Sequence, residues 1–319
     1  MGRMHARSVF QSSYGQLVGI VDPDRSGQDL AAVWHIPYYH DLAQVPEHAY
    51  DAVIIAAPTP YHKFYVLAAA SRKKSVFCEK PLALTVEDSR AMVRACRKAG
   101  VTLTVGLVLR FFPAYRMLYE QIQAQTIGTI SIMRTYRGGQ APQGWDHWYR
   151  DAGQSGGTLS DLVVHDFDFL RWTLGPVQRV YSQRTQQAGQ EVSFTTLIFE
   201  DQVMAQVVGV WAAGPFHMSV EAVGQRGLLQ FDSRQTASWR VSGPPSTASG
   251  TGVSIPDVDE TENPFQLEID DFFEALIFHR PPRVSPEDAI EATKISQMAH
   301  QSIQSRQSLT VEHKGKDGD

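Results

Sequence analysis

The first third of the chain alternates short apolar runs with stretches of helical periodicity. The apolar runs span 17–21, 51–57, 75–78 and 101–105, and turn-forming or charged residues close each of them. Runs that are apolar throughout are typical of parallel strands buried on both faces. Because helical stretches separate the runs, the pattern predicts an α/β domain with a doubly wound parallel sheet of the nucleotide-binding, Rossmann-like kind.

From about Gly128 the periodicity changes to alternation of apolar and polar residues. This pattern predicts a large, mostly antiparallel sheet with one face covered. A helical pattern at 161–174 interrupts the series and predicts a helix that packs on this sheet. Two more helices are predicted at 264–278 and 286–304. The alternating runs are 130–137, 192–199, 204–211, 218–223 and 228–231.

A length of 319 residues exceeds the usual size of one domain, so we expect two. A dinucleotide-binding, Rossmann-like domain is predicted at 1–106. A substrate-binding and oligomerisation α+β domain is predicted at 107–319, and its C-terminal helices could pack back on the first domain. Residues 242–260 are rich in Ser, Gly, Pro and Thr and predict an exposed loop, and the charged end at 313–319 is expected to fray.

The composition excludes several classes of partner. Hydrophobic residues make up 43% and charged residues 20%, with a formal net charge of −5, so neither nucleic acid nor a membrane surface is expected as a partner. No apolar run approaches the ~20 residues of a membrane-spanning helix. Cys78 and Cys96 are the only cysteines, and no Cys or His cluster has zinc spacing. We therefore expect free buried thiols, no metal and a reducing, cytoplasmic location.

Lys80 stands in the tripeptide Glu79-Lys80-Pro81, directly after the apolar run 75–78. The carboxyl ends of parallel strands face the ligand crevice of such a sheet, and the proline stops the strand and fixes the turn. The ammonium group is therefore expected to point at a ligand. A solvated lysine at a strand end is the alternative, because lysine is usually a surface residue.

Asp161 and His165 lie four residues apart in a segment that opens with Gly156-Gly157 and continues with a helical pattern. On a helix that spacing places both side chains on one face, so the carboxylate can orient the imidazole and stabilise its protonated form. Such a pair is suited to act as a general base. An ordinary surface pair, or a buried histidine satisfied by its neighbour, explains the spacing equally well.

The sequence opens with Gly2-Arg3-Met4-His5, which looks like the last glycine of a G-x-G-x-x-G turn and the helix after it. The strand and the two glycines that normally precede this point in a nucleotide-binding sheet do not stand before it. An unpaired buried backbone group costs about 1–3 kcal/mol, so we expect that something fills the slot or that the sheet rearranges. A mis-set start site or a truncation is our explanation.

Together these segments resemble the Gfo/Idh/MocA family, the group of glucose-fructose oxidoreductase and inositol dehydrogenase. The resemblance covers almost the whole chain. No single motif decides it, but the order and spacing of the motifs are specific. The matching segments are GRMHA at 2–6, VDPD at 21–24, APTPYH at 57–62, EKP at 79–81, RFFPAY at 110–115, and Gly156-Gly157 through Asp161 to His165.

The resemblance implies an NAD(P)-dependent oxidoreductase that transfers a hydride between nicotinamide and the hydroxyl carbon of a sugar or polyol. By resemblance, His165 takes the proton of the substrate hydroxyl and Asp161 orients its imidazole. Lys80 stabilises the developing alkoxide by charge and hydrogen bonding. These three residues form the predicted catalytic set.

The resemblance also implies the contacts with the cofactor. Asp22 would bind the adenosine ribose and repel a 2′-phosphate, so NAD is expected rather than NADP, although a plain turn also explains Asp22. His62 would lie near the nicotinamide half, or could be a surface residue at a helix start. Without the glycine turn, weak or absent NAD binding is expected of this chain. The predicted cofactor-binding residues are Gly2, Arg3, Met4, Asp22, Pro58, Thr59, His62, Glu79, Lys80 and Arg110.

Two further residues are candidates for the substrate pocket. Arg110 follows a strand and could reach the cleft, but an arginine that caps the strand end is nearly as plausible. Trp148 lies in the aromatic and polar segment 144–150, which suits a sugar pocket, although the ring could also be core. The predicted substrate-binding residues are Lys80, Arg110, Trp148, Asp161 and His165.

Three functions from different classes remain open. The first is an NAD-dependent dehydrogenase of a sugar or polyol, and the second is a redox-neutral, NAD-dependent glycosidase of the same family. The third is a non-catalytic remnant with impaired cofactor binding. The resemblance also implies a homodimer or homotetramer, in which another subunit covers the open face of the second sheet.

Overall fold

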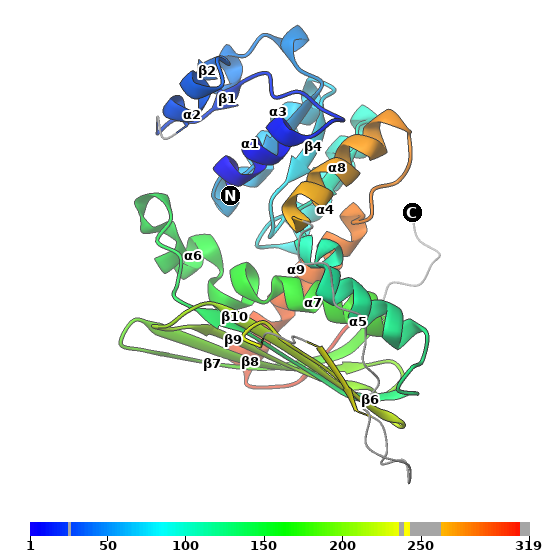
Figure 1. Ribbon diagram of the computed structural model, residues 1–319. Coiled ribbons are helices and arrows are strands. Elements are labelled where there is room, and N and C mark those ends of the chain that lie inside the picture. Colours follow the sequence, from blue (N-terminus) through cyan, green and yellow to red (C-terminus); the bar gives the residue numbers. More distant parts are fainter. Residues whose placement is uncertain (25–26, 236–238, 243–262, 313–319) are drawn as a thin grey trace. The chain divides into compact units, whose positions relative to one another are not determined.

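The computed structural model describes residues 1–24, 27–235, 239–242 and 263–312, and the chain divides into two compact units (Figure 1). The division falls after Phe111, slightly beyond the predicted boundary at Gly106. The predicted loop after Ser242 and the tail at 313–319 lie outside the described residues. Among the described residues, the first unit contains 1–83, 87–111 and 263–290. The second unit contains 84–86, most of 112–242 and 291–312.

The parallel strands of the first unit form two separate sheets. Strand β1 (Ile20–Val21) pairs with β2 (Tyr38–Tyr39), while β3 (Ala52–Ile55), β4 (Ser75–Cys78) and β5 (Leu103–Val105) form a second sheet in that order. The Rossmann-like class is confirmed, and the parallel strands lie in two sheets, a rearrangement that was one of the two outcomes expected from the sequence. Among the described strands, β1 pairs only with β2 and β3 only with β4, so no ladder joins the two sheets.

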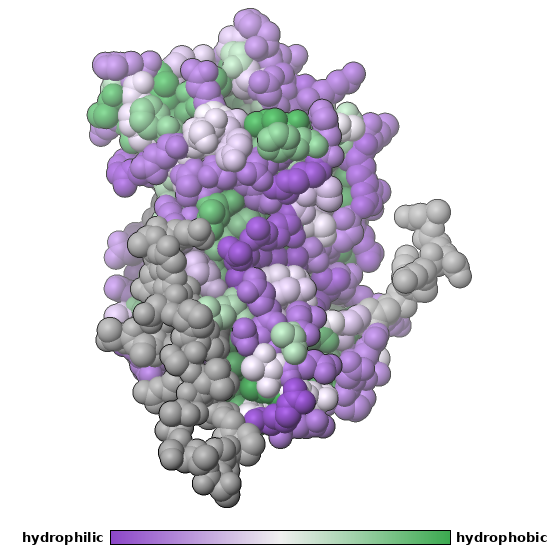
Figure 2. Space-filling view, turned by 45° about the vertical axis from the view of Figure 1, so that its right-hand side comes forward, coloured by the Kyte–Doolittle hydropathy of each residue, from purple (hydrophilic) through white to green (hydrophobic). Residues whose placement is uncertain are grey.

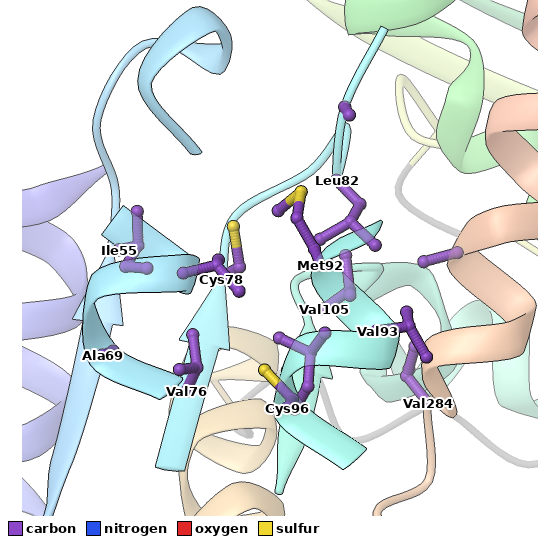
Figure 3. Packing of buried hydrophobic residues seen from close by; sticks show 14 of the residues in the cluster. Ile55, Ala69, Val76, Cys78, Leu82, Met92, Val93, Cys96, Val105 and Val284 are labelled. Carbon is purple, nitrogen blue, oxygen red and sulfur yellow. The ribbon is translucent and has the colours of Figure 1, made fainter. Parts of the chain in front are cut away.

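Helices cover both faces of β4. Val76 and Cys78 point into a core shared with α3 (Thr59–Ser71) and α4 (Val86–Ala99), where Met92 and Cys96 lie (Figure 3). Phe77 points to the opposite face, as the alternation of a strand requires. There it meets Val9 of α1 (Gly2–Gln11) and residues of α8 (Pro264–Ile277). Both cysteines are free and buried, as expected.

The second unit is built on an eight-stranded mixed sheet. Only the β6–β9 pair is parallel among its described ladders, and the five strands predicted from alternation are all present. Strands β7, β12 and β13 were not predicted. The strand order is β12 (Trp239–Ser242), β11 (Gly227–Asp232), β10 (His217–Gly224), β6 (Ile130–Gly139), β9 (Met204–Trp211), β8 (Gln190–Phe199), β7 (Val177–Gln187) and β13 (Leu309–Thr310).

The helices of this unit lie over one face of the sheet (Figure 1). They are α5 (Pro113–Gln123), α7 (Val164–Leu174) and α9 (Pro286–Ser305). The helix predicted at 161–174 is interrupted: a π-helical turn spans Thr158–Leu162, and Val163 separates it from α7 with φ −90° and ψ 3°. Shorter helices are α2 (Gln28–Val33), α6 (Ala152–Ser155) and the 3₁₀ turns at Leu42–Gln44, Glu47–Ala49, Val108–Phe111 and Trp145–Arg150.

Hydrophilic residues cover most of the face drawn in Figure 2, and hydrophobic residues form separate smaller patches on it. Within the part of the chain that the structure describes, no helix is long and apolar enough to cross a membrane.

Candidate active site

The Glu79-Lys80-Pro81 turn directly follows β4. Glu79 is buried, and its Oε2 accepts a hydrogen bond from the Lys80 backbone N–H at 3.0 Å. Its Oε1 lies 2.5 Å from Nε2 of His5, which comes from α1. Burial raises the pKa of Glu79, but the hydrogen bond and charge of His5 and the charge of Lys80 outweigh it, so the net shift is downward. An ionised carboxylate is thus fixed beside half-buried Lys80.

His62 holds the other side of this turn. It lies in the first turn of α3 and is 1% exposed, so it is not a surface residue at a helix start. Its Nδ1 lies 2.9 Å from the carbonyl oxygen of Pro81 and its Nε2 lies 2.9 Å from that of Ala57. Burial lowers the pKa of His62, so the neutral ring donates to one of these carbonyls. A direct contact of His62 with a cofactor stays a prediction.

Several groups in the first unit are suited to hold a dinucleotide. The N-terminus of α1 carries exposed Gly2, Arg3 and Met4 and has no side-chain cap, which leaves a helix end suited to phosphate. At the start of α3, Thr59 is buried, and its Oγ1 has no hydrogen-bond partner among the described residues. A buried hydroxyl without a partner is costly, so a ligand at this point would be stabilised.

Asp22 follows β1 and is half-buried. Its Oδ1 accepts a hydrogen bond from the Asp24 backbone N–H at 2.9 Å, which closes a local turn. The plain-turn alternative is therefore present. A contact of Asp22 with the ribose stays a prediction.

Arg110 is satisfied within the first unit. Its guanidinium is buried and donates to Asp288 Oδ2 at 3.0 Å and to the Arg283 carbonyl at 3.3 Å. Burial raises the pKa of Asp288, but the charge and hydrogen bond of Arg110 and the hydrogen bonds of Ser285 lower it by more, so the net shift is downward. These contacts give Arg110 a structural role that differs from the expected strand-end cap, and its contacts with cofactor and substrate stay predictions.

In the second unit, Asp161 lies in the π-helical turn and His165 in the first turn of α7. Asp161 is buried and His165 is half-buried. Because the backbone leaves the helical conformation at Val163, helix spacing alone does not place the two side chains on one face as the sequence analysis assumed. The orientation of His165 by Asp161 stays a prediction.

Glu191 of β8 fixes the beginning of the π-helical turn. Its Oε1 accepts hydrogen bonds from the Thr158 backbone N–H at 2.7 Å and from Thr158 Oγ1 at 2.8 Å. Its Oε2 accepts from Gln186 Nε2 at 2.7 Å. Gly157, with φ 63°, must be glycine, because a Cβ there would lie 2.4 Å from Glu191 Oε1. A buried carboxylate thus caps the segment that carries Asp161.

A second polar group holds the same turn from α9. Ser160 Oγ lies 2.9 Å from Ser296 Oγ and 3.1 Å from His300 Nε2. Ser296 Oγ also donates to the Leu159 carbonyl at 3.1 Å. Burial and the nearby charge of Arg184 lower the pKa of His300, which favours the neutral ring.

A buried ion pair anchors α7 next to His165. Arg137 Nε donates to Asp166 Oδ2 at 2.6 Å, and Arg137 also donates to the Tyr115 hydroxyl at 3.2 Å. The paired charge of Asp166 outweighs desolvation and raises the pKa of Arg137, while burial raises that of Tyr115. The helix that carries His165 is therefore tied to the sheet.

Trp148 lies in the 3₁₀ turn Trp145–Arg150 and is 9% exposed. Its ring packs against Tyr149 at a centroid distance of 4.0 Å. Tyr149 in turn contacts Trp211 edge to face. The structure accounts for Trp148 as part of an aromatic cluster, and its contact with substrate stays a prediction.

Two family profiles match most of the chain. Residues 1–107 match the profile described as an oxidoreductase family with an NAD-binding Rossmann fold, and residues 119–312 match that of the same family's C-terminal alpha/beta domain. The chain belongs to the Gfo/Idh/MocA family. The resemblance that the sequence motifs indicated is thereby confirmed, together with the nicotinamide-binding class of its first domain.

Similar proteins include enzymes of several reaction types. A myo-inositol 2-dehydrogenase of Thermotoga maritima is 27% identical over 284 residues, which cover 86% of this chain and 83% of the relative. A 2,7-anhydro-N-acetylneuraminate hydratase of Escherichia coli is 30% identical over 258 residues, or 75% of this chain and 67% of the relative. The crystal structure of GenD2 from gentamicin A biosynthesis, in complex with NAD, superposes with a TM-score of 0.86 at 23% identity, covering 98% of this chain and 94% of that one.

The sequence motifs of this Gfo/Idh/MocA chain identified its candidate site residues. They did not identify the residues that hydrogen-bond the turns on which those candidates lie. No role was given to His5, Glu191 or His300. A signal for Glu191 exists, because the inward positions of β8 begin with Glu191, Ser193 and Thr195, polar residues on a buried face. Across the described residues, no group of three or more His, Cys, Asp and Glu side chains could hold a metal ion.

Proposed function

We propose that this chain is an NAD-dependent dehydrogenase that oxidises a hydroxyl group of a sugar or cyclic polyol. The observation that carries the proposal is the edge of the β3–β4–β5 sheet. Thr59, with its buried hydroxyl, follows β3, and Lys80 follows the parallel neighbour β4. Carboxyl ends of parallel strands meet at one edge, where such sheets bind their ligands. Dehydrogenases of inositols among the relatives support a polyol substrate.

Each of the three predicted catalytic residues has a distinct task. His165 accepts the proton of the substrate hydroxyl on an imidazole nitrogen, and Asp161 favours the protonated ring by its negative charge. Lys80 donates a hydrogen bond from Nζ to the substrate oxygen as negative charge develops there. The nicotinamide, when bound, supplies the hydride acceptor.

NAD is the proposed cofactor rather than NADP. The N-terminus of α1 would take the pyrophosphate, and Thr59 Oγ1 would hydrogen-bond the nicotinamide half. Asp22 carries a negative charge at the end of β1, where it would accept the ribose hydroxyls and repel a 2′-phosphate.

The test is NADH formation by the purified chain with a panel of inositols and free sugars. Lys80→Met and His165→Gln are expected to lower kcat by about 100-fold or more. Lys63→Met is the matched control, because Lys63 is a half-buried lysine of the same unit, like Lys80, and its partner is Asp88 at 2.6 Å. Normal kcat in Lys80→Met would refute the assignment of Lys80.

A redox-neutral reaction is the second candidate, favoured by one relative whose name describes a hydratase of an anhydro sugar. The same residues would act, but NADH would not accumulate. Release of an aryl group from aryl glycosides, dependent on NAD and without net NADH, would support this candidate over the dehydrogenase.

Self-association through the second sheet completes the proposal. The helices of this unit cover one face, and the other face carries the cross-strand row Tyr136, Val208 and Phe194. Phe194 and Met204 are exposed large hydrophobic residues on that face. Exposed apolar side chains on a sheet face are suited to a two-fold contact with a second copy, giving a dimer or tetramer. A monomer by light scattering would refute it.

A further inference from the structure

Two buried histidines hold the turn that carries Lys80, and neither has a part in the proposed chemistry. His5 comes from α1 and reaches the turn through Glu79 Oε1 at 2.5 Å. His62 comes from α3 and reaches it through the Pro81 carbonyl at 2.9 Å. Each of the two residues is 1% exposed. Burying a polar ring is unfavourable without hydrogen bonds, and these contacts offset part of that cost, although His5 Nδ1 has no partner among the described residues.

The surroundings allow His5 little freedom. Its ring packs edge to face against Phe77 of β4 at a centroid distance of 5.1 Å, which fixes the ring plane. The hydrogen bond to Glu79 joins ionisable groups in a buried place, where such bonds are strong. Glu79 in turn accepts the backbone N–H of Lys80 at 3.0 Å. A chain of contacts therefore runs from α1 to the Lys80 backbone.

The far side of the turn is held as well. Leu82, 1% exposed, packs into the core cluster that contains Met92 of α4 (Figure 3). With His62 Nδ1 2.9 Å from the Pro81 carbonyl oxygen, separate elements of the first unit contact the backbone on both sides of Lys80. The side chain of Lys80 thus extends from a backbone that is fixed at each end.

We propose that His5 and His62 are positioning residues that aim Lys80, one through the carboxylate of Glu79 and the other through the carbonyl of Pro81. The inference rests on the proposed function, because it assumes that Lys80 contacts the reacting oxygen. Catalytic groups act within narrow limits of position, and a displacement of about 1 Å can cost 100-fold in rate. The two histidines would therefore affect turnover without touching substrate.

The test compares His5→Phe, which keeps a flat apolar ring, with His5→Gln, which keeps a donor toward Glu79. His5→Phe is expected to lower kcat about 10- to 100-fold while KM for the polyol and Kd for NAD change by less than about threefold. His5→Gln is expected to recover most of the lost kcat. His62→Phe is expected to lower kcat by a similar factor, and a rise in Kd for NAD in this variant would instead indicate the predicted contact of His62 with the cofactor. Thr104→Val is the matched control, because Thr104 is a buried residue of adjacent β5 whose Oγ1 has no partner among the described residues.

Hydrogen–deuterium exchange at the Lys80 amide gives a readout that does not depend on turnover. Loss of His5 should leave Glu79 freer and speed exchange of this amide, and Thr104→Val should leave it unchanged. Should His5→Phe not fold, Glu79→Gln takes its place, because it keeps the size of the side chain and loses the charge.

Unchanged kcat in a folded His5→Phe variant would overturn the inference, and so would an equal loss in Thr104→Val. Failure of the proposed function has a different signature, since the unmodified chain would then oxidise no alcohol with NAD. In that case hydrogen–deuterium exchange at the Lys80 amide is the remaining test of the positioning role. Unchanged exchange in His5→Phe would overturn that role.

Discussion

Glu268 is a buried acid whose protonation should make the stability of this protein depend on pH. It lies in α8 with 0% exposure, and both carboxyl oxygens have no hydrogen-bond partner among the described residues. Burial, the charge of Glu79 and that of Asp271 raise the pKa of Glu268 well above its usual range. The folded protein therefore keeps Glu268 protonated at pH values where the unfolded chain ionises it. We expect Glu268→Gln to remove this difference.

The size of the effect follows from proton linkage. Above the unfolded pKa of about 4.3, the folded state binds one proton more than the unfolded state at Glu268. The free energy of unfolding of the unmodified protein therefore falls by about 1.4 kcal/mol per pH unit from this group, until the pH passes the raised folded pKa. Glu268→Gln lacks this pH dependence. The free energy of unfolding of the variant, relative to that of the unmodified protein, should therefore rise by about 1.4 kcal/mol per pH unit.

Urea unfolding at about pH 5 and about pH 6 measures this slope directly, with circular dichroism as the signal. Glu274→Gln, on the same helix, is the control. Hydrogen bonds from Arg280 and Tyr14 lower the pKa of Glu274, so its stabilising effect is lost only as the pH falls below the usual range of a glutamate. That variant should show a constant difference between the two pH values. If Glu268→Gln also shows a constant difference, the protonated-acid argument is wrong.

Three other substitutions or additions test separate parts of the structure. Asp22→Ser should raise the affinity for NADP relative to NAD, because the repulsion of a 2′-phosphate is removed, and calorimetry with both cofactors measures it. Glu191→Ala leaves the Thr158 N–H without its acceptor and should cost about 2–4 kcal/mol in urea unfolding, with a matching loss of kcat; a cost below 1 kcal/mol would contradict the capping role. Joining an apolar strand and a G-x-G turn ahead of α1 should connect β1 and β3 and tighten NAD binding, whereas equal affinity with and without the addition would contradict that reasoning.

The strands that could be predicted are those with a strong periodic signal. The runs 75–78 and 204–211 were predicted with the bounds that β4 and β9 have, because most of their side chains are apolar on both faces. Strand β7 was missed, since VQRVYSQRTQQ is rich in polar residues, and the strand lies between β8 and the two-residue edge strand β13, where hydrogen bonds of the ladder rather than burial stabilise it. The split of the parallel sheet was expected only as one of two outcomes, because local periodicity carries no information about which strands pair.

The break in the predicted helix at 161–174 has a related cause. The apolar pattern of this segment is compatible with a continuous α-helix. Hydrogen bonds of Glu191 to Thr158 and of Ser296 to the Leu159 carbonyl act on the backbone at the start of the segment. These partners come from β8 and α9, so the π-helical turn is accompanied by tertiary contacts. A local sequence pattern carries no information about such contacts.

A buried glutamate carboxylate holds each of the two turns that carry Lys80 and Asp161. Glu79 accepts the backbone N–H of Lys80, and Glu191 accepts that of Thr158, in the turn of Asp161. A carboxylate has two oxygens, so each can accept a turn amide with one oxygen and a partner from another element with the other. That partner is His5 of α1 for Glu79 and Gln186 of β7 for Glu191. Because the holding groups of each turn belong to the same unit as the turn, each unit carries its own predicted catalytic group in a fixed position. Substitution of either carboxylate should therefore disturb one group and leave the other in place.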